Sequence, residues 1–265
     1  MDPRVTTYNP LDEIFAADLN AIQDRAAEVA WLNGYMRGGK RLRSNPTTND
    51  SVYVSRILAL VLGNKVFSTV AETQVTYAKA ESPGWNGSTG NGWWYLYAFN
   101  NAGTLDYVFS QTAPDDALMF KSGTTTHRYL GCVYTLSANT IFDFVAVNGV
   151  YRWSAKQPVS PSTLSSNTAA TITASGRCAP PHARELQCVA LVQNSGTGAE
   201  DDLIVRNNNT SLSNDEKTVV AAAANTDGVG EFSIITDTSQ RFKAYTTPNA
   251  INTNIWSIGF SEETP

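Results

Sequence analysis

Few residues in this chain could act as catalysts or metal ligands. It contains two histidines, His127 and His182, and three cysteines, Cys132, Cys178 and Cys188. Cys178, His182 and Cys188 lie close together in sequence, but their spacing matches no standard zinc motif and a fourth ligand is missing. We therefore expect no metal ion. We interpret the cysteines as buried thiols, and a bond between Cys178 and Cys188 is the alternative.

Acidic residues occur as adjacent pairs, at Asp115–Asp116, Asp201–Asp202 and Glu262–Glu263. Neighbours on a strand point to opposite faces, so such a pair does not by itself form an acid–base site. A glycosidase needs two acids held roughly 5–10 Å apart across a cleft. The chain also lacks the G-x-S-x-G, H-E-x-x-H and phosphate-loop motifs. We predict that the protein is not an enzyme and uses no cofactor; a depolymerising enzyme is the less favoured alternative.

Aromatic residues are concentrated in one stretch, WWYLYAF at 93–99, which follows a turn-rich segment at 82–92. Flat aromatic rings can stack on sugars, and the neighbouring glycine and asparagine residues can supply hydrogen bonds. Trp85, Trp93 and Trp94 are therefore candidate glycan-binding residues. The alternative interpretation is that these rings belong to the core of a β-sandwich.

The elements that would position these residues are predominantly β-strands. The stretch 93–99 has apolar residues on both alternating faces, which indicates a strand buried on both sides. Asn100–Gly103 and Asn148–Gly149 have the composition of hairpin turns. Short strand patterns recur to the end of the chain with no second long helix, which favours a sandwich or jelly-roll architecture.

We predict a mainly β protein in which an N-terminal α-helix is followed by two β-sandwich or jelly-roll-like domains. The predicted segments are 1–44 for a helical anchor, 45–155 for the first β-domain and 156–265 for the second. The connection between the β-domains is placed in 155–166, because this stretch contains two prolines and several serines.

Residues 9–36 form the only long helical pattern. Asn9 is a suitable N-cap, and Pro10 suits the first helical position. Apolar residues then recur at alternating steps of four and three residues, which is a heptad pattern with one polar position. The predicted oligomerisation residues are Phe15, Leu19, Ile22, Ala26, Val29, Asn33 and Met36. Leucine at position a with isoleucine at d favours more than two strands, so we expect self-association; docking of the helix on its own β-domain is the alternative.

Composition and charge exclude several classes of protein. Charged residues make up 16% of the chain, below the roughly 25% of an average soluble domain. The net charge of -5 argues against a general nucleic-acid binder. The N-terminus has no pattern of a secretory signal, and no apolar run approaches the roughly 18 residues of a membrane-spanning helix. We expect a protein made in the cytosol that does not insert into a membrane.

Three stretches resemble virion proteins of tailed bacteriophages. Residues 18–24, DLNAIQD, are similar to the N-terminal helix of such proteins. Residues 93–135 resemble a segment in which an aromatic strand precedes an N-N-x-G-T turn, an S-x-x-A-P break and an R-Y-L-G strand. Residues 231–240 and 258–262 resemble the C-terminal β-domains of these proteins.

This resemblance implies a structural protein of the phage particle, displayed on the tail, on a fibre or on the capsid surface. It further implies a homotrimer that contacts other virion proteins, with a host-surface glycan as a further partner. Such a protein is made in the cytoplasm of the host bacterium and becomes part of the virion. The chain is short and lacks the repetitive shaft of a dedicated tail fibre, so capsid decoration stays an alternative. A stand-alone carbohydrate-binding β-sandwich is the alternative outside this family.

Overall fold

The computed structural model describes residues 33–39, 41–81, 92–137, 140–159, 163–164, 168–174, 176–193, 202–208, 217–220, 226–237, 239–247 and 251–262. Within these residues the regular structure is antiparallel β-sheet, apart from one short 3-10 helix, η2 (Tyr77–Lys79). This confirms the prediction of a mainly β protein. No helix in the described part of the chain is long and apolar enough to cross a membrane.

The largest sheet has nine strands and contains residues from both halves of the sequence. Its order is β18 (Asp227–Ile235), β15 (Glu185–Gln193), β20 (Ile251–Ser261), β12 (Val150–Pro158), β11 (Phe144–Val147), β2 (Arg41–Ser44), β3 (Ser51–Val54) and β6 (Thr73–Thr76). The ninth strand, β13 (Thr163–Leu164), pairs with β20.

Three smaller sheets complete the fold. One contains β1 (Met36–Gly38), β4 (Ile57–Leu62) and β5 (Lys65–Phe67). The second contains β10 (Thr140–Ile141), β9 (His127–Ser137), β7 (Gly92–Asn101) and β8 (Thr104–Ser110). The third contains β14 (Ala170–Thr173), β19 (Arg241–Thr247), β16 (Asp202–Asn207) and β17 (Lys217–Val220).

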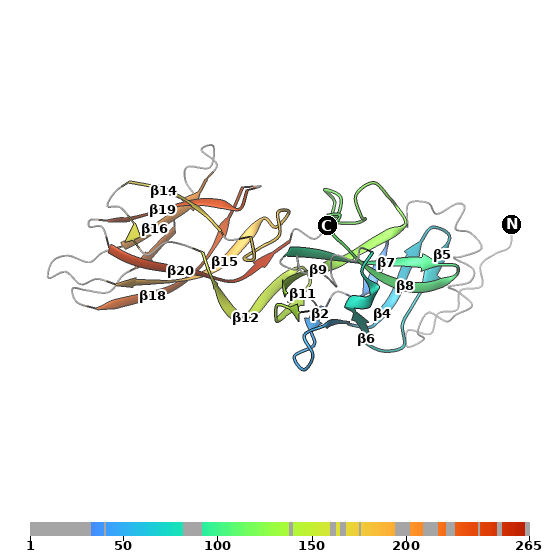
Figure 1. The fold of residues 1–265 in the computed structure, drawn as a ribbon. Helices are drawn as coiled ribbons and strands as arrows, with labels where there is room; N and C mark the ends of the chain where they lie inside the picture. The colour runs from blue at the N-terminus through green and yellow to red at the C-terminus, as the bar shows by residue number, and fades with distance from the viewer. Residues whose placement is uncertain are drawn as a thin grey trace, which may run out of the picture.

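The molecule is elongated and has two lobes (Figure 1). The N-terminal lobe contains β1 to β9, and the C-terminal lobe contains β14 to β19. Strands β12 and β20 connect them, because β20 pairs with β15 on one side and with β12 on the other. The nine-stranded sheet therefore runs through both lobes without a break.

Strand β7 agrees with its prediction. Residues 94–98 are all buried, so both faces of the strand are covered. The two predicted hairpin turns are also confirmed: Ala102 and Gly103 have positive φ between β7 and β8, and Asn148 and Gly149 have positive φ between β11 and β12. Positive φ at both central residues suits the right-handed twist of the flanking strands.

The helix prediction is wrong for residues 33–36. Asn33 and Gly34 form a turn, and Met36 begins strand β1, where it pairs with Leu60 of β4. Gly34 has a φ of +84°, and its N–H donates to the Val61 carbonyl. The hydrogen bonds of this stretch are made with β4, which is distant in sequence, and not within a helix. The other predicted oligomerisation residues, from Phe15 to Val29, lie outside the described residues.

Two of the predicted segments, the anchor and the connection, contain strands of the nine-stranded sheet. Strand β2 lies within the predicted segment 1–44 and belongs to this sheet. Strand β12 continues to Pro158, and its later part pairs with β20 after a shift in register between Arg152 and Gln157. The predicted connection at 155–166 is therefore partly strand. Where one domain ends and the next begins stays an interpretation.

Candidate functional site

Of the tryptophans predicted to bind glycans, Trp94 is buried and Trp93 is partly buried. Trp94 is only 2% exposed, so its ring cannot stack on a sugar. The Trp93 indole packs edge-on against Phe260 at 5.6 Å, and its N–H donates to the Gly176 carbonyl at 2.6 Å. The core interpretation therefore applies to Trp94, while glycan binding by Trp93 stays a prediction. Trp85 lies outside the described residues.

The three cysteines are buried thiols, as expected. His182, which the sequence places near Cys178 and Cys188, contacts a different cysteine. Its imidazole lies in a group with Cys132 of β9 and with Glu262, the residue directly after β20.

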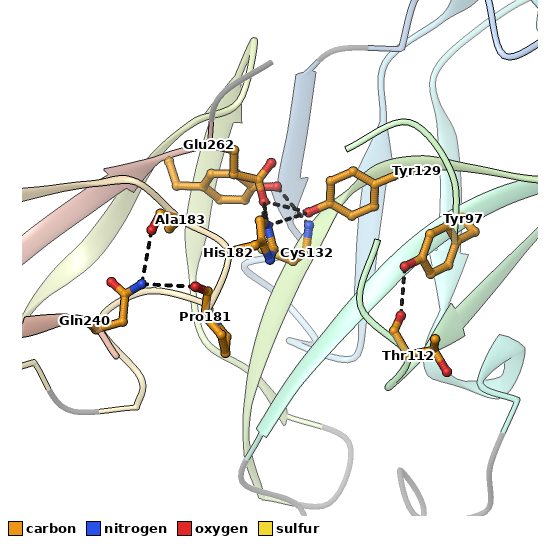
Figure 2. A network of polar contacts seen from close by, with 10 residues as sticks. Tyr97, Thr112, Tyr129, Cys132, Pro181, His182, Ala183, Gln240 and Glu262 are labelled. Carbon is orange, nitrogen blue, oxygen red and sulfur yellow. Dashed lines mark hydrogen bonds and ion pairs between the residues drawn. The ribbon is translucent and has the colours of Figure 1, made fainter. Parts of the chain in front are cut away.

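Four side chains from three parts of the chain meet at one carboxylate oxygen (Figure 2). Glu262 Oε1 lies 2.5 Å from Tyr129 Oη, 2.8 Å from His182 Nε2 and 3.3 Å from Cys132 Sγ. Tyr129 Oη is also 3.5 Å from His182 Nε2. We call Tyr129, Cys132, His182 and Glu262 the junction cluster, because β9 belongs to the N-terminal lobe and His182 precedes β15 of the C-terminal lobe.

An irregularity in β9 brings Tyr129 and Cys132 to the same carboxylate. Residues three apart on a regular strand point to opposite faces. Here the register against β7 shifts, so that Tyr97 pairs with Tyr129 while Leu96 pairs with Gly131. The extra residue of this bulge reverses the alternation.

Gly131 allows a second strand to approach the bulge closely. Its φ is +150°, and a Cβ at this position would lie 2.4 Å from Tyr151 Oη. Tyr151 Oη accepts a hydrogen bond from the Cys132 N–H at 2.8 Å. The absent side chain thus lets β12 support the backbone beside the Cys132 thiol.

Backbone hydrogen bonds hold Glu262 and the His182 turn in place. The Glu262 N–H donates to the Gly149 carbonyl at 2.8 Å, which fixes the end of β20 beside the β11–β12 turn. The Ala183 N–H donates to the Pro180 carbonyl, and the Gln240 side-chain amide donates to the carbonyls of Pro181 and Ala183 (Figure 2). Hydrogen bonds to main-chain carbonyls therefore position both Glu262 and the turn that contains His182.

Burial determines the protonation of the cluster's donors. The Glu262 side chain is 3% exposed and the His182 side chain 16%. Burial raises the pKa of Tyr129 and of Cys132 well above their usual ranges, and the charge of Glu262 adds to both shifts. The phenol and the thiol therefore keep their protons and donate them to the carboxylate. A thiol held in this form is a weak nucleophile.

His182 takes part through one ring nitrogen. Its Nδ1 is buried and has no hydrogen-bond partner among the described residues. A proton on Nε2 can be donated to the Glu262 carboxylate, whereas a proton on Nδ1 has no acceptor there.

A pocket of about 300 Å³ adjoins the cluster. It is lined by Tyr95, residues 113–116 and Leu118 of the N-terminal lobe, and by residues 181–184 and 236–237 of the C-terminal lobe, which include His182. Leu118 has a φ of +51°, an uncommon conformation for a branched side chain. The pocket gives solvent a route to His182.

Sequence reasoning did not find the junction cluster. It considered Glu262 only together with Glu263, and it considered His182 together with Cys178 and Cys188. Cys132 and Glu262 are 130 positions apart, and no local pattern connects them. The bulge that turns Tyr129 toward the cluster depends on pairing with β7, so no signal in one sequence could have revealed it.

Neither a known protein-family model nor a curated protein sequence matches the chain.

Proposed function

We propose that this chain is a structural protein of a tailed-bacteriophage particle, displayed on the tail or the capsid surface as a homotrimer. In this proposal a helix within residues 9–32 assembles the copies and attaches them to other virion proteins. Two β-sandwich-like domains project from that attachment. The protein is made in the host cytoplasm and functions on the virion.

The position at which the N-terminal segment joins the fold supports this proposal most directly. Asn33 is held by two contacts: its side-chain amide donates to the Thr125 carbonyl at 3.1 Å, and its Oδ1 accepts from the Gly63 N–H at 2.9 Å. Gly63 lies in the turn between β4 and β5. Strand β5 is at the end of the molecule opposite β14, β16 and β18 (Figure 1). A segment that joins at one end leaves the other end available for display.

The sequence of the N-terminal segment supports assembly. The apolar positions from Phe15 to Val29 keep the heptad spacing even without Asn33 and Met36. About two heptads alone are marginal for a coiled coil, so the β-lobes would have to contribute contacts to a stable trimer. A host-surface glycan is a further proposed partner, and Trp85 and the partly buried Trp93 are the candidate residues for it.

A pair of substitutions in the full chain tests the assembly. Ile22→Asp places a charge at heptad position d, whereas Ala21→Asp places the same charge one residue away, outside the seam. Sedimentation equilibrium should give a trimer for the unmodified chain and for Ala21→Asp, and a monomer for Ile22→Asp. Incorporation into phage particles should fall in parallel.

Two outcomes would contradict the proposal. A monomeric unmodified chain would favour a helix docked on its own lobe. Normal incorporation of monomeric Ile22→Asp into particles would remove the proposed role of the segment.

A further inference from the structure

The junction cluster contains the donor atoms of a zinc site. Cys132 offers a sulfur, His182 a ring nitrogen and Glu262 a carboxylate oxygen, and these atoms all lie within 4.8 Å of one another. In tetrahedral zinc sites, bond lengths of 2.0–2.3 Å place neighbouring ligand atoms roughly 3.3–3.7 Å apart. The separations of 2.8 Å for nitrogen to oxygen and 3.3 Å for sulfur to oxygen are close to that range. Small side-chain rotations would therefore open a coordination site.

The charge of the cluster also favours a divalent cation. The Glu262 side chain is 3% exposed, and its carboxylate oxygen faces Tyr129, Cys132 and His182. A buried charge is costly unless it is paired or coordinates a metal. One Zn²⁺ bound to a thiolate and a carboxylate gives a site with no net charge.

We propose that Cys132, His182 and Glu262 bind one Zn²⁺ ion, with water in the fourth position. On binding, the Cys132 thiol loses its proton to solvent and the sulfur's lone pair forms the metal bond. The imidazole binds through Nε2 and carries its proton on Nδ1. Zinc coordination outweighs the cost of that buried N–H, because structural zinc sites release several times the energy of one lost hydrogen bond.

Tyr129 completes the site without binding the ion. Its hydroxyl lies 2.5 Å from Glu262 Oε1, so it can keep donating to the carboxylate while that group binds zinc. Hydrogen bonds of this kind orient metal-binding carboxylates. The pocket beside His182 provides the path by which the ion enters.

The ion would join three separate parts of the chain. Cys132 lies on β9 of the N-terminal lobe, His182 lies in the turn before β15, and Glu262 ends the described chain after β20. Zinc binding would therefore stabilise the contact between the lobes. This role is structural and does not depend on where the protein is displayed.

Cobalt substitution tests the proposal on the full chain. The purified protein is freed of metal with a chelator and titrated with Co²⁺, which reports a thiolate ligand through a charge-transfer absorption in the near ultraviolet. The unmodified chain should bind one Co²⁺ and show this absorption, and Zn²⁺ should remove it. Zn²⁺ should also raise the melting temperature by several degrees.

Two matched substitutions identify the cysteine. Cys132→Ser keeps a hydrogen-bond donor toward Glu262 but removes the sulfur, so it should abolish the absorption and the thermal shift. Cys188→Ser changes another buried thiol outside the cluster and should retain both. Circular dichroism confirms that each variant is folded.

Other results would overturn the proposal. The proposal is wrong if the unmodified chain lacks the charge-transfer absorption, or if Cys132→Ser still shows it. If Cys188→Ser lost the absorption and Cys132→Ser kept it, the ion would be assigned to Cys178, His182 and Cys188 instead. If Cys132→Ser does not fold, X-ray absorption of the zinc-loaded unmodified chain decides: one sulfur ligand is expected, and none or two contradicts the site.

Discussion

Glu262 receives hydrogen bonds from three side chains at one buried oxygen. Removing that oxygen leaves three buried donors without their acceptor, and each costs about 1–3 kcal/mol before relaxation. We expect Glu262→Ala to lower the free energy of unfolding by about 3 kcal/mol in the presence of a chelator. Urea denaturation measures this change. Glu231→Ala, at an exposed carboxylate on β18, should change the free energy by less than about 0.5 kcal/mol, and a similar loss in both variants would contradict the assignment.

Asp237 lines the pocket, and its lowered pKa predicts that the stability of the protein depends on pH. Burial opposes its ionisation, but hydrogen bonds from Asn208, Arg241 and Ser239 outweigh burial and lower its pKa. A carboxyl whose pKa is lower when folded stabilises the protein above its unfolded pKa of about 3.9, and this contribution is lost as pH falls through the folded pKa. Asp237→Asn should therefore destabilise the protein at pH 7. The difference should shrink below pH 4, as measured by denaturation at several pH values.

The matched control is Asp227→Asn, which changes an exposed carboxylate at the start of β18. It should alter stability little at pH 7. If Asp237→Asn showed the same destabilisation at pH 7 and at pH 3, the effect would come from packing and not from the carboxylate charge.

At the scale of elements, the contact between β12 and β20 depends on a glycine. A Cβ on Gly259 would lie 2.0 Å from the Tyr151 carbonyl oxygen, so the two strands could not keep their spacing. Gly259→Ala should lower the free energy of unfolding by more than about 3 kcal/mol or prevent folding. Gly92→Ala adds the same methyl group on β7, where nothing lies within 4 Å, and should be tolerated. Thermal denaturation of both variants measures the difference.

The elements that sequence reasoning predicted correctly are those with local signals. Strand β7 has its alternating aromatic pattern, and the β11–β12 hairpin has the Asn148–Gly149 turn, which specifies its own backbone conformation. The errors occur where a distant strand supplies the hydrogen bonds. Met36 continues a helical spacing, yet β4 pairs with it from more than twenty residues away. Prolines predicted a connection near residue 158, yet β20 pairs with that stretch from almost one hundred residues away.

The candidate site could not be predicted for the same reason. Three of its four residues, Cys132, His182 and Glu262, had been noticed as chemically capable, but not as one group. Their grouping depends on the β9 bulge and on the return of β20 to the N-terminal lobe. Both features are set by sheet pairing across the whole chain.

At the scale of the whole molecule, the shared sheet predicts that both lobes unfold together. Tyr151 of β12 stacks on Phe260 of β20 with ring centroids 4.3 Å apart, and Trp93 of β7 packs on the same ring. The lobes therefore share strands and an aromatic core. Differential scanning calorimetry should show a single transition, and Phe260→Ala should lower its midpoint as a unit. Two separate transitions in the unmodified chain would show that the lobes are independent.

The direction of the shared strands has a mechanical consequence. Strands β15, β18 and β20 run along the length of the molecule (Figure 1), and β15 pairs with β20 at every residue from Glu185 to Gln193. Tension between the two ends would apply shear to these hydrogen bonds, so that all of them bear the force together. Peeling a strand from an edge instead breaks them one after another. A protein tethered at its N-terminal end and pulled at the other would resist extension as a stiff rod. It would pass the force to whatever holds its first thirty-two residues.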